Sequence, residues 1–96
     1  MLKLKPSCEQ CDVGLPPDST DARICTFECT FCSECVETIL RNVCPNCGGG
    51  FERRPIRPKD KLAVRPATME RTHKPMDPQS HAKLLGRFEH TPPNKR

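Results

Sequence analysis

Residues 8–47 have the sequence CEQCDVGLPPDSTDARICTFECTFCSECVETILRNVCPNC and contain all eight cysteines of this 96-residue chain. The cysteines form four close pairs, each with two or three residues between its members: Cys8 and Cys11, Cys25 and Cys29, Cys32 and Cys35, Cys44 and Cys47. Such a short spacer lets one tight turn direct both sulfurs at a metal ion about 2.3 Å away. Eight thiols in four pairs therefore predict two four-cysteine zinc sites.

The rest of the composition indicates a chain that needs such a metal. Hydrophobic residues make up 34% and aromatic residues 4%, with no Trp or Tyr, so the apolar core is too small to stabilise the domain alone. Residues 1–6 lack the apolar run of a signal peptide, and no stretch resembles a membrane span. We therefore expect a cytoplasmic protein without membrane association, in which paired thiols bind metal. Disulfides are the alternative.

The formal net charge of +4 is divided unevenly along the chain. Residues 1–50 carry four Lys or Arg and seven Asp or Glu (net −3), whereas residues 51–96 carry twelve and five (net +7). Seven of the eleven prolines and all three histidines follow residue 54, and no cysteine does. The sequence therefore predicts a metal-binding domain over residues 1–54 and a basic, proline-rich tail over residues 55–96, mostly disordered on its own.

One short helix is predicted within the tail. Asp77 can cap it, Pro78 suits its first turn, Leu84 and Leu85 share a face, and Gly86 is expected to end it. The three histidines, spaced eight and nine residues apart among prolines, are expected to be solvated rather than metal-binding: His73, His81 and His90.

Within residues 1–54 the pattern predicts a short hairpin followed by one short helix. Residues 22–27 and 28–31 are rich in β-favouring side chains, which indicates two paired strands. Ser33 is a suitable N-cap for a helix of about two turns that ends near Asn42. Its expected buried stripe has the spacing i, i+3, i+4 and i+7: Val36, Ile39, Leu40 and Val43. Phe51 is the last side chain expected to pack on the domain.

The order of the pairs resembles a RING finger in which cysteine replaces the usual fourth-ligand histidine. Cys29-Thr30-Phe31-Cys32 stands where RING domains often have His-x-Phe-Cys, and Cys44-Pro45-Asn46-Cys47 matches the usual final pair. Residues 1–58 also closely resemble a bacterial family of short cysteine-rich proteins, domain of unknown function 1272. Three stretches carry that resemblance: residues 15–20, 28–32 and 44–50.

The RING resemblance implies a small α+β zinc domain of the RING-like or treble-clef kind with a cross-braced arrangement of ligands. The first and third pairs would hold one zinc ion: Cys8, Cys11, Cys32 and Cys35. The second and fourth pairs would hold the other: Cys25, Cys29, Cys44 and Cys47. The sequence itself leaves other combinations of the pairs open.

The function expected from these features is a structural zinc module that acts in protein–protein interaction or as a regulatory scaffold, with an unidentified protein partner. We expect no catalysis, because a closed four-sulfur site has no open coordination position. The RING resemblance would also imply ubiquitin-ligase activity. Half of the recruiting surface is missing, however: Pro45 fits, but Gln10 is polar, Ile39 stands where Trp is common, and Gly48 replaces a basic residue. We therefore expect no ligase activity.

Three alternatives remain at this point. The basic residues 53–96 could bind nucleic acid as part of a regulatory protein, although Phe88 is the one aromatic residue beyond residue 54. The thiols could serve a zinc-responsive or redox-responsive sensor. An iron–sulfur cluster is disfavoured, because eight residues separate Cys35 from Cys44 where ferredoxin-like runs have three.

Overall fold

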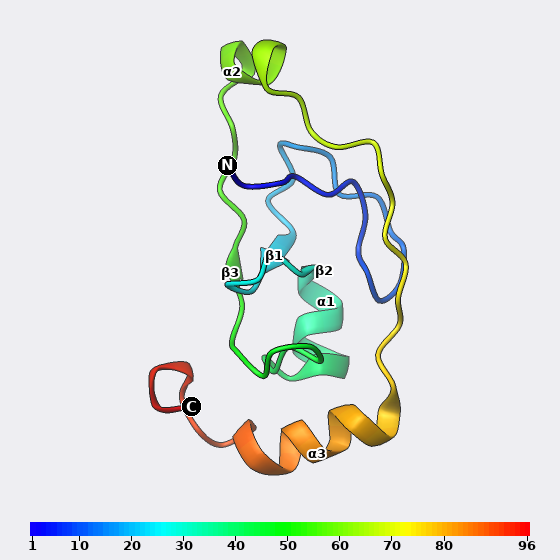
Figure 1. Ribbon diagram of the computed structural model, residues 1–96, viewed down its shortest axis with the longest axis vertical. Coiled ribbons are helices and arrows are strands. Elements are labelled where there is room, and N and C mark those ends of the chain that lie inside the picture. The colour runs from blue at the N-terminus through cyan, green and yellow to red at the C-terminus, as the bar shows by residue number, and fades with distance from the viewer.

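A three-stranded antiparallel sheet with the order β2-β1-β3 lies at the centre of the computed structural model, which describes residues 1–96 (Figure 1). β1 (Ala22–Ile24) pairs with β2 (Thr30–Cys32) and with β3 (Glu52–Arg53). The predicted hairpin is therefore confirmed, with shorter strands than expected. Five of the expected strand residues, 25–29, instead form the loop between β1 and β2.

The helix that follows β2 is irregular. α1 (Ser33–Cys35) continues directly as the π-helical turn η1 (Val36–Leu40), and the left-handed φ of 51° at Arg41 ends it. The N-cap is Cys32 rather than Ser33, whose hydroxyl donates to the Asp21 carboxylate.

The predicted apolar stripe of this helix is wrong at one position. Val36, Leu40 and Val43 are buried, but Ile39 is 38% exposed. A π-turn has more residues per turn than an α-helix, so positions expected on one face rotate apart.

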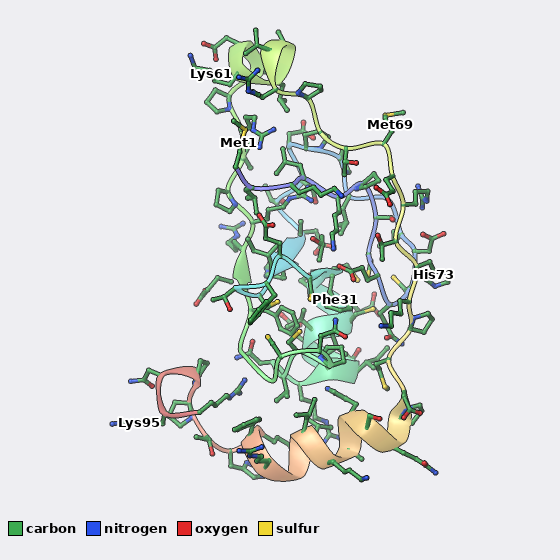
Figure 2. All side chains as sticks on the ribbon, in the orientation of Figure 1. Met1, Phe31, Lys61, Met69, His73 and Lys95 are labelled. Atoms are coloured by element: carbon green, nitrogen blue, oxygen red, sulfur yellow. The ribbon has the colours of Figure 1, made fainter.

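Sulfur supplies much of the core. Six of the twelve residues in the main buried cluster are cysteines, and within it Phe31 packs edge-to-face on Phe51, with ring centroids 5.3 Å apart. Figure 2 shows Phe31 near the middle of the molecule. Phe51 is buried as expected. Because this core contains so few apolar side chains, its stability depends on the interactions that hold the cysteine sulfurs together.

The tail follows a defined path around the domain. The sequence predicts a mostly disordered tail, whereas the structure contains α2 (Lys59–Val64), α3 (Pro78–Phe88) and the 3₁₀ turn η2 (Pro93–Lys95). The chain leaves β3, turns at α2 at one end of the molecule, and returns along the opposite side to α3 (Figure 1). The reason for the difference is contact with residues 1–50, which tail composition does not reveal. No helix has both the length and the apolar character needed to cross a bilayer.

α3 is the helix expected from the sequence, with one correction. The Asp77 carboxylate accepts a hydrogen bond from the Ser80 N–H at 3.2 Å, and Pro78 occupies the first turn. The helix passes through Gly86 and ends at Phe88. Its buried face packs against the domain, and this contact outweighs the weak helix propensity of glycine.

Candidate metal centre

The first and third cysteine pairs meet in one cluster. The four sulfurs of Cys8, Cys11, Cys32 and Cys35 all lie within 4.8 Å of one another, and those of Cys11 and Cys32 are 3.8 Å apart. Four ligands placed about 2.3 Å from a zinc ion at tetrahedral angles are separated by about 3.8 Å. A disulfide would need about 2.05 Å, and all eight cysteines are free. The spacing therefore suits a tetrahedral metal ion.

Local backbone geometry directs these sulfurs inward. In the first turn the Asp12 N–H donates to the Cys8 carbonyl at 2.9 Å, and Asp12 has a left-handed φ of 65°. The Cys11 N–H lies 3.5 Å from the Cys8 sulfur. On the other side Cys32 ends β2 and Cys35 ends α1, so a strand-to-helix turn presents both sulfurs. The backbone geometry of each turn therefore directs its two cysteine sulfurs toward the same point.

The second cluster draws on the second and fourth pairs. The sulfurs of Cys25, Cys44 and Cys47 lie within 4.8 Å of one another, with Cys25 and Cys44 3.7 Å apart. Cys29 is outside that set of three but adjacent to it: its sulfur accepts a hydrogen bond from the Asn46 side-chain amide at 3.3 Å. The structure thus brings seven of the eight predicted ligands into two clusters and leaves Cys29 at the edge of the second.

The thiols of the two clusters differ in acidity for identifiable reasons. A hydrogen bond from Cys44 lowers the pKa of Cys29 to about 5, and burial raises the pKa of Cys25 to about 11. Burial also raises the pKa of Cys35. Burial opposes ionisation of Cys8 as well, but backbone N–H groups, with that of Cys11 first, lower its pKa overall. Buried thiolates need a cation to be stable together, which is what a bound metal supplies.

Two buried charged residues were missed in the sequence, Glu9 within the first cysteine turn and Arg54 after β3. The carboxylate of Glu9, which is only 5% exposed, accepts hydrogen bonds from the Thr30 N–H at 2.5 Å and the Lys5 ammonium at 3.1 Å. The Arg54 guanidinium is buried and donates to three backbone carbonyls: Lys5, Leu15 and Pro16. Glu9 could have been suspected from its place between two cysteines; no sequence signal marks Arg54.

The extended segment of the tail, residues 66–77, runs along the turn that carries Cys8 and Cys11. The Lys74 N–H donates to the Glu9 carbonyl at 2.9 Å, and the Met76 N–H donates to the Gln10 side chain at 2.8 Å. Arg71 pairs with the Asp12 carboxylate at 3.0 Å. Figure 2 shows His73 on this segment, beside the N-terminal loop. The tail therefore covers one side of the first cluster.

α3 covers the turn formed by the last cysteine pair. His81 is 2% exposed, and its Nε2 lies 2.9 Å from the Val43 carbonyl oxygen. The prediction of a solvated side chain is thus wrong for His81, although His73 and His90 are exposed. The spacing could have revealed this, because four residues of α3 recur at i, i+3, i+4 and i+7: His81, Leu84, Leu85 and Phe88.

Comparison with known proteins identifies the family of this chain. A family model described as protein of unknown function (DUF1272) matches residues 1–57, more than half of the chain. The chain belongs to this family. A protein of Rhizobium meliloti (strain 1021), described as uncharacterized, is 60% identical over 75 residues, which are 78% of this chain and 89% of that protein. No solved structure matches the chain.

The DUF1272 match confirms the family resemblance expected from the sequence. It includes both cysteine clusters and the whole sheet. The similarity to the Rhizobium meliloti protein covers more residues than the DUF1272 model does, so it continues into the tail. The tail is therefore shared, at least in part, with that relative.

Proposed function

We propose that this DUF1272 protein is a structural zinc module with a RING-like or treble-clef fold, in which two zinc ions are each held by four cysteines. The observation that carries the proposal is the sulfur spacing: separations of 3.8 Å and 3.7 Å match the edge of a zinc–thiolate tetrahedron. The interleaved use of the pairs, first with third and second with fourth, is what a cross-brace requires. A small movement of Cys29 would complete the second site.

Metal binding would then supply most of the folding free energy. Each structural zinc site contributes an apparent binding free energy of about 10–16 kcal/mol, whereas a whole domain is typically stable by about 5–15 kcal/mol. Half of the main buried cluster is cysteine, and without metal those thiols offer little to replace this contribution. We expect the metal-free chain to be unfolded.

The role we propose for this module is protein–protein interaction or regulatory scaffolding in the cytoplasm, without catalysis. A site closed by four sulfurs leaves no coordination position for a substrate or water. The zinc ions would instead fix the loops of a small domain that has little other means of rigidity. Interaction surfaces benefit from such rigidity, because less conformational entropy is lost on binding.

A zinc-responsive or redox-responsive sensor is the second candidate. It is favoured by the exposure of Cys11, the one exposed cysteine of the eight. An accessible ligand sulfur is where oxidation would begin and metal release would follow. This candidate predicts loss of zinc from the first cluster before the second under mild hydrogen peroxide.

Nucleic-acid binding through residues 53–96 is less well supported. Several of the arginines in that range are occupied within the chain: the guanidinium of Arg57 donates to the Leu2 carbonyl, that of Arg96 to the Asn42 carbonyl, and Arg71 pairs with Asp12. Fewer cations are then free to neutralise phosphates. A gel shift with unrelated duplexes should show no binding at physiological salt; binding that weakens steeply as salt rises would favour nucleic acid instead.

Native mass spectrometry and a visible absorbance spectrum of freshly purified protein test the zinc module. We expect a colourless protein with two zinc ions that loses its helical circular dichroism signal after complete chelation. A brown protein that absorbs in the visible range would indicate an iron–sulfur cluster. A metal-free mass lower by eight hydrogen atoms would indicate four disulfides. Either result would overturn the proposal.

A further inference from the structure

One cysteine loop beside the metal clusters is left uncovered by the tail. The tail forms hydrogen bonds to the first cysteine turn and, through α3, packs on the last one, but no hydrogen bond joins residues 55–96 to residues 25–29. At the tip of this loop Phe27 is 74% exposed. A phenylalanine this exposed loses the free energy that burial would give it, unless a partner covers it.

The loop that presents Phe27 is well fixed by its own backbone. The Cys25 N–H donates to the Cys29 carbonyl at 3.2 Å, and the Glu28 N–H donates to the Cys25 carbonyl at 3.0 Å. Glu28 adopts a left-handed φ of 65°, which closes the turn. Both ends of the loop carry proposed zinc ligands. Phe27 is therefore held on a short, hydrogen-bonded turn rather than on a mobile loop, as an interface anchor requires.

Two hollows flank this loop. One, of about 400 Å³, is lined by Leu2, Ile24 and Thr26 together with Glu28 and Glu52. The other, of about 590 Å³, extends toward Phe88 and Pro93 of the tail. The two hollows share three lining residues, Thr26, Gly50 and Glu52, so they adjoin each other, and Thr26 directly precedes Phe27 in the loop. A bulky side chain of a partner could enter the smaller hollow while Phe27 packs on the partner.

The smaller hollow is lined by two acidic residues, Glu28 and Glu52, and by no basic residue, whereas Arg96 lines the larger hollow. Ile24 and Glu52 are paired directly across β1 and β3, so their side chains lie on the same face of the sheet. Arg23 and Arg53 are the neighbouring pair and lie on the opposite face. Glu28 and Glu52 form no ion pair within the chain, although the Glu28 carboxylate accepts a hydrogen bond from the Lys3 backbone N–H at 3.2 Å. The smaller hollow therefore carries two carboxylates whose charge no cationic side chain of the chain neutralises.

We propose that the surface formed by Phe27, Ile24, Glu28 and Glu52 binds a segment of a partner protein that carries Lys or Arg next to a bulky apolar side chain. The apolar side chain fills the smaller hollow and packs on Phe27, and the cation pairs with Glu28 or Glu52. This inference rests on the proposed zinc module, because the ends of the loop are held by its ligands. It adds the chemistry of the partner and the place where it binds.

The test is selection of a random dodecapeptide library, displayed on phage, against the zinc-loaded full chain. We expect enriched peptides to pair Lys or Arg with a bulky apolar residue. A synthetic peptide of the enriched sequence should bind at least about tenfold more weakly to Phe27→Ala. It should also bind more weakly, with less dependence on salt, to the double variant E28Q/E52Q, in which glutamine keeps the hydrogen-bonding capacity. Met69→Ala, which removes a 92% exposed side chain elsewhere, is the matched control and should not change binding.

Native mass spectrometry of the same preparation separates the two ways in which the inference could fail. A chain that carries two zinc ions but enriches no peptide, or enriches acidic peptides, overturns the surface and leaves the zinc module intact. Equal binding of the peptide by the wild type and by Phe27→Ala would likewise overturn the surface and leave the zinc module intact. A chain that does not hold two zinc ions overturns the proposed module, and the surface with it.

Discussion

Glu9 and Thr30 hold each other by two hydrogen bonds: the Glu9 N–H donates to the Thr30 carbonyl at 2.9 Å, and the Thr30 N–H donates to the Glu9 carboxylate at 2.5 Å. Glu9 lies in the turn between Cys8 and Cys11, and Thr30 directly follows Cys29. The pair therefore links the turn of the first cysteine cluster to the residue that follows Cys29, a proposed ligand of the second site, through one backbone and one side-chain hydrogen bond. We expect loss of the Glu9 side chain to weaken this link.

Glu9→Ala should lower the free energy of unfolding of the zinc-loaded protein by about 1.5–3 kcal/mol, because it leaves the buried Thr30 N–H without its charged acceptor. Urea unfolding at a fixed concentration of free zinc measures this. Glu34→Ala removes an exposed carboxylate from α1 and should change stability by less than about 0.5 kcal/mol. Equal effects of the two substitutions would show that the Glu9 bonds contribute nothing beyond surface charge.

Gly48→Ala should destabilise the contact between the last cysteine turn and α3. Gly48 has a φ of 77°, and a Cβ built there would lie 2.8 Å from the Phe88 ring. The strained backbone costs about 1–2 kcal/mol, and the ring must also move. Gly86→Ala is the contrasting variant, since its Cβ meets nothing within 4 Å; within a helix it should stabilise by about 0.5–1 kcal/mol. Thermal unfolding compares them, and two changes of the same sign would contradict the packing described.

His81→Ala should release α3 from the domain. The substitution removes the hydrogen bond to the Val43 carbonyl and leaves a cavity under the helix. A loss of about 1.4 kcal/mol raises the open population tenfold, so trypsin should cut after Lys83 or Arg87 about tenfold faster. His90→Ala is the control, because the His90 side chain is 95% exposed. Unchanged cleavage of the His81 variant would mean that α3 is not held by this side chain.

The helix cap at Asp77 predicts a pH dependence. Hydrogen bonds from the Ser80 hydroxyl and N–H lower the pKa of Asp77 below its ordinary 3.8. The cap is then fully present above that ordinary pKa and is lost as the pH falls through the lowered one. Acid also removes zinc from thiolates, so the titration uses a peptide of residues 75–91 with Glu89→Gln. Its helical circular dichroism at low temperature should fall on acidification, and that of the Asp77→Asn peptide should not; parallel titrations would refute the cap.

Local chemistry in the sequence predicted some features of the structure and could not predict others. The spacing of the cysteines identifies which sulfurs share a turn, and the β-favouring residues around Cys25 and Cys29 indicate the hairpin, because both depend on neighbours in sequence. The exposure of Ile39 depends on a π-turn, and the path of the tail depends on backbone N–H groups such as that of Lys74, which bonds to Glu9. Backbone donors are the same in every sequence, so no pattern reveals them. Burial of His81 could have been predicted from its helical spacing with Leu84 and Leu85.

The proposed metal centre holds two metal ions in cross-braced four-cysteine sites. The most direct test replaces zinc with ¹¹³Cd and correlates each cadmium resonance with the cysteine Hβ protons by NMR. We expect two cadmium resonances. One should couple to Cys8, Cys11, Cys32 and Cys35, and the other to Cys25, Cys29, Cys44 and Cys47. A single resonance, a cadmium coupled to the first and second pairs together, or a second site without Cys29 would contradict the proposed metal centre.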